Sequence, residues 1–195
     1  MNETLSQELH DWTALRQQSV FRQLLTAFSY PGRVETLVAL TDPSDALTPT
    51  LATLLDGAVS LADPDGLVSP LTRKRLQVTL THDTGTAPFV VAQGSRPPSF
   101  TPCVGSLESP EYGATLLLRV DLLGQGPLLQ LEGPGINGTI PLCVTGLHAR
   151  WITQRNEWNA GFPQGVDMIL FDKQRIVALP RTTRITLQEH SAWDM

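Results

Sequence analysis

The sequence predicts an α/β fold, a single domain in which a mixed β-sheet is flanked by helices. Apolar residues recur at helical spacing over residues 11–29 and 147–158, whereas short apolar runs of strand length lie between and after these segments. With 195 residues, of which 41% are hydrophobic, the chain can bury one sizeable core. Because the sequence contains neither a repeat nor a linker, we expect one domain over residues 1–195.

The N-terminal half is expected to alternate helices with short strands. Pro31-Gly32 ends the first helix, because proline disfavours helix in the residue before it and glycine permits the turn. Two shorter helices, each with a proline near its start, are expected over residues 48–56 and 69–76. The strands expected in this half are residues 34–40, 58–62 and 89–92.

The C-terminal half is expected to be rich in antiparallel strands. Two apolar runs, residues 166–171 and 176–179, flank a polar four-residue turn and predict a β-hairpin. We also expect strands over residues 114–122 and 127–131, joined by Gly124-Gln125-Gly126 as a hairpin loop.

Two further segments of this half read as irregular structure. Residues 93–113 hold many prolines and glycines, and loops of this length in a compact domain are usually functional, at an interface, or mobile. Gly133-Pro134-Gly135 predicts a tight turn, in which Gly135 would also let a ligand or a partner approach the backbone closely.

The charge balance excludes some classes of partner. A net charge of -5 argues against nucleic acid or an anionic membrane. The basic cluster Arg73-Lys74-Arg75 fits a solvated helix turn better than a nucleic-acid footprint, which is usually broader. No apolar run approaches the roughly 20 residues that span a bilayer.

The first residues and the cysteines indicate a cytoplasmic protein. The N-terminal segment is polar and acidic and lacks the pattern of a signal peptide. Cys103 and Cys143 are far apart in the sequence, which predicts two buried thiols in a reducing compartment and no disulfide.

Several kinds of catalytic or cofactor site find no support in the sequence. The four histidines are scattered, so we predict no metal site, and neither a P-loop nor a G-x-S-x-G nucleophile motif is present. The two lysines, Lys74 and Lys173, fall in a helix turn and at a hairpin tip. A pyridoxal-phosphate (PLP) enzyme needs a lysine inside its active site, so we expect no PLP.

The best remaining candidate is an anion site at the end of the predicted hairpin. Arg181 is followed by Thr182 and Thr183, and a cation beside two hydroxyls suits an anionic ligand. Arg33 could add a second positive charge, and Asp167 could orient the arginine. The alternative is an edge strand whose arginine pairs with an acid, and the sequence leaves both open.

Five segments together resemble one protein family. They are residues 21–32, which match the pattern F-R-x-L-L-x-A-(M/F)-S-x-P-G; Gly113-Ala114-Thr115-Leu116 with Gly133-Pro134-Gly135-Ile136; residues 162–167; and Ala178-Leu179-Pro180-Arg181-Thr182-Thr183. Each segment is weak alone, but their order and spacing resemble the H-subunit family of bacterial carbon–phosphorus lyase systems. The resemblance spans residues 10–185 and leaves residues 186–195 as a tail.

This resemblance implies a role in the use of phosphonates. It implies a core complex with G, I and J subunits, which supports the displacement of adenine from ATP by a phosphonate to form a ribose 1-phosphonate 5-triphosphate. It also implies a homodimer when the subunit is isolated, and a fold like that of PLP-dependent transferases without the cofactor. The alternative is a stand-alone phosphonate- or nucleotide-binding protein or transferase.

The family supplies no established catalytic residue for this subunit, so the resemblance yields only motif positions as ligand or interface candidates. These are Arg22, Arg33, Gly135, Asp167, Arg181, Thr182 and Thr183.

Overall fold

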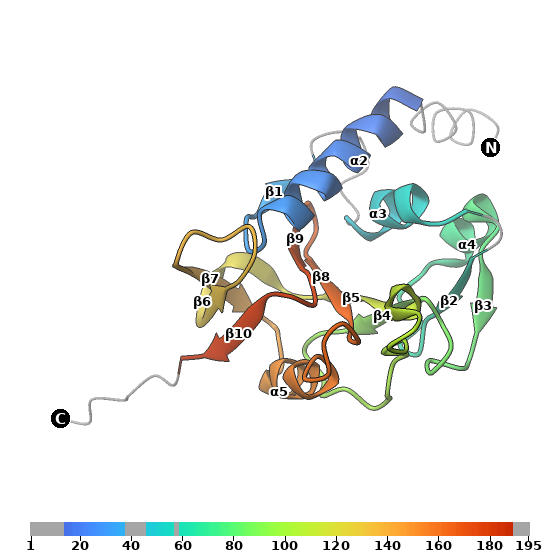
Figure 1. Cartoon of the computed structure of the whole chain (residues 1–195). Coiled ribbons are helices and arrows are strands. Elements are labelled where there is room, and N and C mark those ends of the chain that lie inside the picture. Colours follow the sequence, from blue (N-terminus) through green and yellow to red (C-terminus); the bar gives the residue numbers. More distant parts are fainter. Residues whose placement is uncertain (1–13, 38–45, 57–58, 189–195) are drawn as a thin grey trace.

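A computed structural model describes residues 14–37, 46–56 and 59–188, which form two β-sheets and four α-helices within these ranges (Figure 1). The large sheet has seven strands in the order β1-β9-β8-β5-β4-β2-β3. The small sheet has three strands in the order β10-β6-β7. The prediction of an α/β fold with a mixed sheet flanked by helices is confirmed.

The large sheet is mixed because the first two strands in the order, β1 and β9, pair in antiparallel fashion, β1 with β9 and β9 with β8. Five strands are parallel to one another, and β9 and β1 extend the sheet in antiparallel fashion. The parallel strands are β2 (Ser60–Ala62), β3 (Thr79–Thr81), β4 (Phe89–Gln93), β5 (Thr115–Arg119) and β8 (Asp167–Phe171). The predicted hairpin is confirmed as β8 and β9 (Arg175–Leu179), and β1 is Glu35–Thr36.

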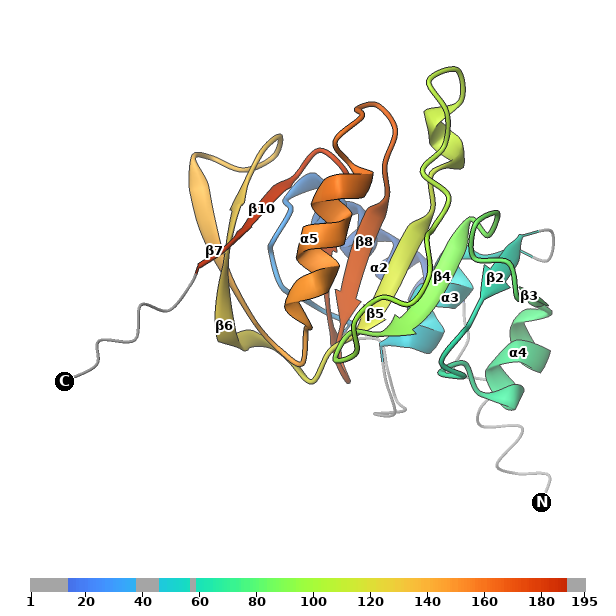
Figure 2. The ribbon, with the colours of Figure 1, turned by 90° about the horizontal axis from the view of Figure 1, so that it is seen from below.

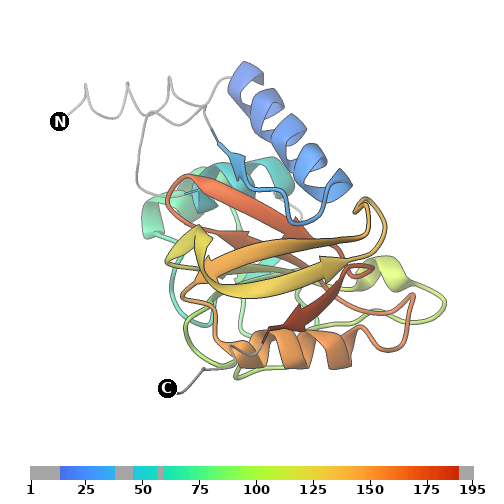
Figure 3. The ribbon, with the colours of Figure 1, turned by 90° about the vertical axis from the view of Figure 1, so that its left-hand side faces the viewer.

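The large sheet is buried on both faces. Along β8, Met168 and Leu170 join one apolar cluster while Ile169 and Phe171 join the other, as the two-residue period of a strand requires. One face is covered by α2 (Ala14–Ser29) and α3 (Leu47–Leu54). The other is covered by α5 (Ala149–Trp158) and by the small sheet, so the protein has three layers (Figures 2 and 3).

The predicted helices are confirmed over the described residues. The backbone turns at Gly32, whose φ is +84°, and α2 ends at Ser29 as expected from Pro31-Gly32. The helix α4 (Pro70–Leu76) begins after Ser69, whose side chain accepts a hydrogen bond from the Thr72 N–H and so caps the helix. Parts of the first helix and first strand, residues 11–13 and 38–40, lie outside the described residues, as do residues 57–58.

The expected hairpin around Gly124-Gln125-Gly126 is wrong. These residues lie within β6 (Leu122–Glu132), which pairs with β7 (Thr139–Thr145) and β10 (Arg184–Leu187) and not with β5. The register shifts between Leu123 and Leu128, so the glycines form an irregularity in the strand. A Cβ on Gly126 would lie 2.3 Å from the Thr145 Oγ1, which explains why the partner strand requires glycine there.

The irregular segment predicted over residues 93–113 is confirmed from residue 94 onward, since Gln93 ends β4, and it holds a single turn of 3-10 helix, η1 (Pro110–Tyr112). Its ends are held by the rest of the protein, since the Trp151 Nε1–H donates to the Arg96 carbonyl at 2.7 Å and the Ala114 N–H to the Cys103 carbonyl at 2.8 Å. Three strands, β3, β7 and β10, are not predicted by the sequence. None of the described helices has the length and apolar character that crossing a membrane demands.

One buried carboxylate joins the two sheets. Asp172, at the β8–β9 turn, is 5% exposed and accepts hydrogen bonds from the backbone N–H of Leu123 in β6 at 3.0 Å and of Gln174 at 3.1 Å. It also binds the Arg175 guanidinium, with an Nη2–Oδ2 distance of 2.6 Å. Burial would raise the pKa of Asp172, but the hydrogen bonds from Arg175, Leu123 and Gln174 outweigh it and hold the pKa below its ordinary value.

We predict that Asp172→Asn lowers the free energy of unfolding by about 2–4 kcal/mol at pH 7, because it removes a buried charge-assisted interaction. Since the pKa of Asp172 is lower in the folded state, its contribution is present above the unfolded carboxyl value and is lost as the pH falls through the folded one. The difference between wild type and variant in urea unfolding should therefore narrow below about pH 4. Glu157→Gln, an exposed carboxylate on α5, is the control. A difference that stays constant down to pH 2 would contradict this role.

Candidate functional site

Arg181 is the centre of the candidate site. After β9 the chain turns at Pro180, and the Asp167 carboxylate at the start of β8 binds both the backbone N–H of Arg181, at 2.7 Å, and its Nη2, at 2.9 Å. The Arg181 Nη1 donates to the carbonyls of Pro110, at 2.6 Å, and Pro163, at 3.3 Å. We call these four residues the Arg181 junction.

Two polar side chains support this junction, one on α5 and one on the residue directly after that helix. Arg155 is only 1% exposed, and its guanidinium donates to the backbone carbonyls of Leu179, Pro180 and Thr183. Asn159 binds the backbone of Val166 through both its amide N–H and its carbonyl oxygen, and donates to the Arg181 carbonyl at 3.3 Å. These contacts supply hydrogen-bond donors to backbone carbonyls at the end of β9 and in the turn that follows it.

Arg155 keeps its charge in this environment. Burial lowers the pKa of Arg155 to about 10, while the negative charge of Asp167 acts in the opposite direction. At neutral pH the guanidinium is therefore protonated and can donate to several carbonyls at once. Its Nε has no hydrogen-bond partner within the described part of the chain.

The two predicted hydroxyls do not accompany Arg181 on one surface. Thr182 is exposed, whereas Thr183 is 2% exposed and its Oγ1 has no hydrogen-bond partner among the described residues. The Arg181 charge is matched by Asp167 at 2.9 Å, with the two side chains 16% and 22% exposed. The junction is thus electrically neutral and largely satisfied by the protein itself.

Glycine is required where the segments of the site meet. A Cβ on Gly113 would lie 2.2 Å from the Gly165 carbonyl oxygen and 2.9 Å from the Arg181 Nη1. Gly135 has a φ of +82°, and a Cβ there would lie 2.4 Å from the Ser29 carbonyl oxygen and 2.8 Å from the Pro31 ring. The close approach predicted at Gly135 is therefore made by the chain's own backbone at the end of α2.

The other predicted cations lie elsewhere. Arg22 is exposed on α2, and Arg33 is an exposed residue whose Nε forms an ion pair with the Glu35 carboxylate at 2.7 Å. Among the described residues, no hydrogen bond or ion pair links Arg22 or Arg33 to the Arg181 junction. The structure therefore brings Asp167 and Arg181 together, whereas Arg22 and Arg33 lie outside the Arg181 junction.

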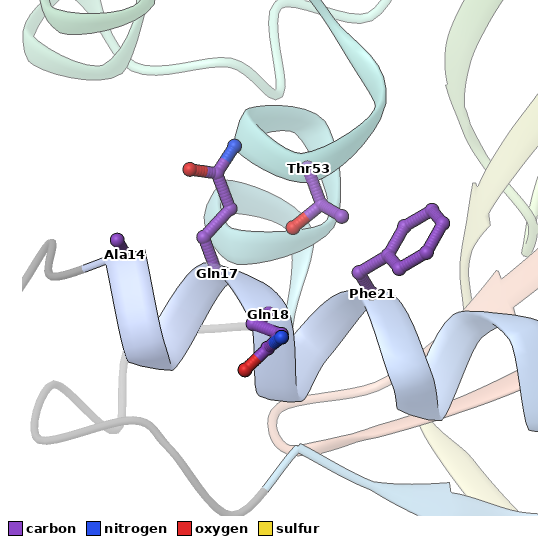
Figure 4. Close-up of a pocket in the computed structure, with 5 residues that line it drawn as sticks. All are labelled: Ala14, Gln17, Gln18, Phe21 and Thr53. Atoms are coloured by element: carbon purple, nitrogen blue, oxygen red, sulfur yellow. The ribbon is translucent and has the colours of Figure 1, made fainter.

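A groove between α2 and α3 has a volume of about 270 Å³ (Figure 4). Its lining contains no ionisable side chain and consists of Ala14, Gln17, Gln18, Phe21 and Thr53. Within the described ranges no three His, Cys, Asp or Glu side chains come close enough to hold a metal ion, and His10 and His190 lie outside those ranges. Cys103 and Cys143 are free thiols and half-buried, where full burial was expected.

Comparison with known protein families identifies the family of this chain. Residues 9–186 match the family model described as bacterial phosphonate metabolism protein (PhnH). The chain belongs to the PhnH family. The match covers the Arg181 junction, α5 and both sheets up to Thr186, in agreement with the family suggested by the sequence motifs.

Two curated relatives cover most of the chain. HtxG of Stutzerimonas stutzeri, named as a C-P lyase subunit protein, is 49% identical over 178 residues, which are 91% of this chain and 89% of HtxG. The subunit PhnH of alpha-D-ribose 1-methylphosphonate 5-triphosphate synthase from Rhizobium meliloti (strain 1021) is 30% identical over 182 residues, covering 86% of this chain and 89% of that protein.

The PhnH family motifs found in the sequence are in contact in the structure. The segment with Gly113 touches Gly165 and Arg181, and the Gly133-Pro134-Gly135 turn touches Ser29 at one end and Thr182 at the other. Sequence analysis missed Arg155 and Asn159 as residues of the site. A charged residue on the apolar face of the 147–158 helix, beside Trp151 and Ile152, was the signal that could have identified Arg155.

We predict that Arg155→Met lowers the free energy of unfolding by about 2–4 kcal/mol, because the carbonyls of Leu179, Pro180 and Thr183 each lose the hydrogen bond that Arg155 donates inside the protein. Thermal and urea unfolding measure the change. Arg150→Met, on the exposed side of the same helix, is the control and should change stability by less than about 0.5 kcal/mol. Equal stability of the two variants would show that these hydrogen bonds are dispensable.

Proposed function

We propose that this chain is a subunit of the complex that makes ribose 1-phosphonate 5-triphosphates in phosphonate catabolism. In this reaction a phosphonate oxygen forms a bond to C1′ of the ATP ribose, the glycosidic bond to adenine breaks, and adenine leaves. The reaction uses ATP, so the proposal implies a cytoplasmic location.

The observation that carries the proposal is the family match over residues 9–186, together with relatives named as subunits of this enzyme system. The geometry agrees with a supporting role. The charged groups of the Arg181 junction bind one another and backbone carbonyls, so the junction serves to hold loops in place. A subunit of this kind would act mainly by completing an assembly.

The partners and the fold relationship belong to the same proposal. We infer association with the G, I and J subunits, and a homodimer when the chain is isolated. We also infer a fold related to PLP-dependent transferases without the cofactor. The exposure of both lysines, Lys74 and Lys173, supports only the part of this inference that concerns the missing cofactor, because a Schiff base needs a lysine that faces an enclosed site.

We predict that adenine release from ATP and methylphosphonate requires this chain. The assay reconstitutes the G, H, I and J subunits of one host with the L protein, with this chain as the H subunit, and measures free adenine by chromatography. Omission of the chain should reduce the rate at least tenfold and weaken co-purification of the remaining subunits. A full rate without the chain would contradict the proposal.

A second function, direct binding of a nucleotide or phosphonate, is favoured by one observation. The Arg181 side chain is 16% exposed and lies next to the exposed Thr182, so an oxyanion could reach it from solvent. Bound phosphonate would then compete with Asp167 for the guanidinium.

The test is titration of the isolated protein with ATP and methylphosphonate. If Arg181 holds the oxyanion, Arg181→Ala should weaken binding about tenfold or more, because a charge-assisted contact is worth about 1.5–3 kcal/mol. Arg184→Ala, which removes an exposed arginine three residues away, is the control. No binding by the wild type, or equal binding by Arg181→Ala, removes this second function.

A further inference from the structure

Three large apolar side chains are exposed on the two loops that the Arg181 junction joins. Leu107 is 70% exposed, Tyr112 is 68% exposed and Phe162 is 69% exposed. Tyr112 lies two residues after Pro110 and Phe162 lies directly before Pro163, and the carbonyls of both prolines accept from the Arg181 Nη1. We call Leu107, Tyr112 and Phe162 the loop patch.

The two loops lie side by side and project from the same edge of the protein (Figures 2 and 3). They are also bound to each other directly. The Gly165 N–H donates to the Val104 carbonyl at 2.8 Å, and the Gln164 side chain donates to the Gly105 carbonyl at 3.1 Å. At the tip, Ser106 Oγ accepts from the Ser109 N–H at 3.0 Å.

This bonding fixes the backbone that carries the loop patch. A preformed surface loses little conformational entropy on association, and exposed aromatic residues held in place are typical anchors of protein interfaces. Apolar side chains exposed on such a backbone contribute nothing to the core, so their stability role is small.

The location favours a protein over a small molecule. The loops lie at the amino ends of β5 and β8, next to Thr115 and Asp167, which are register partners. Small ligands of open α/β sheets bind as a rule at the opposite edge, beyond the carboxyl ends of the strands. The loops that carry the loop patch also project from the body of the protein (Figure 2), whereas small-molecule sites are concave.

The charge beside the patch indicates the character of the partner. Glu108 and Glu111 are exposed on the same loop as Leu107 and Tyr112, and neither forms an ion pair with any described residue. The one arginine of the junction is already matched by Asp167. Two exposed carboxylates beside apolar residues on one loop complement an apolar surface that also carries lysine or arginine.

We propose that the loop patch, with Glu108 and Glu111, docks a partner subunit of the phosphonate-processing complex through an apolar surface rimmed by basic side chains. The proposal rests on the proposed function, since it specifies where and with what chemistry that assembly forms. Arg181 then acts as a positioning residue that sets the geometry of both loops without contacting the partner.

The experiment measures binding of the full chain to the purified G, I and J complex by calorimetry. Tyr112→Ser and Leu107→Ser should each weaken binding tenfold or more. The pair Glu108→Lys with Glu111→Lys should weaken it at least tenfold at about 0.1 M salt, and its deficit should shrink at about 0.5 M salt, where exposed charges are screened. Far-ultraviolet circular dichroism and thermal unfolding of each variant should match those of the wild type.

Two control variants change exposed residues on other surfaces of the protein. Leu71→Ser, on α4, removes an apolar side chain that is 53% exposed, and Glu157→Lys reverses an exposed charge on α5. Both should bind as the wild type does. Phe21→Ser with Leu25→Ser tests the exposed side of α2 as a rival interface.

The outcomes separate this inference from the function it rests on. If the wild type binds and the loop-patch variants bind equally well, or if only the α2 variants lose binding, the docking site is overturned and the proposed function stands. If the wild type itself does not bind, the proposed function fails and the docking site fails with it.

Discussion

The passage of the chain from the large sheet to the small one is the constraint on which the candidate site depends. Between β9 and β10 the backbone leaves one hydrogen-bonded ladder before it enters the next, so buried carbonyls of this passage need donors other than neighbouring strands. The buried guanidinium of Arg155 donates to three carbonyls here, those of Leu179, Pro180 and Thr183. An uncharged side chain could not supply that many donors, which explains why a cation is kept between a helix and a sheet despite the cost of burying it.

The same turn determines what Arg181 can do. Its guanidinium donates hydrogen bonds to Asp167 and to two loop carbonyls, so most of its N–H donors are already used within the chain. The residues that identified the family are therefore largely those that hold the loops to the sheet. In a protein that works as one subunit among several, a fixed loop geometry is a direct functional property, because a partner can bind only a surface that keeps its shape.

Sequence patterns predicted much of this architecture because local signals decide it. Pro31-Gly32, Ser69-Pro70 and the apolar runs around residues 172–175 each specify a helix end or a hairpin through their own backbone chemistry. Pairing between distant strands is not encoded in this way, which is why the prediction of a hairpin loop at Gly124-Gln125-Gly126 is wrong. The Asp167–Arg181 pair was foreseen as one of two alternatives. The supporting contacts of Arg155 and Asn159 could not be foreseen, because they bind backbone atoms that only the folded turn brings to α5.

The contact between Gly135 and Ser29 has a consequence for how such proteins diverge. The two residues lie more than a hundred positions apart in the sequence, yet a single added methyl group at Gly135 would collide with the Ser29 carbonyl and the Pro31 ring. Any lineage that replaces this glycine must first move the end of α2, and a change at the helix end alters the space left for the turn. The two segments are therefore expected to be inherited together, and chimeras that take them from different relatives should fold less well than either parent.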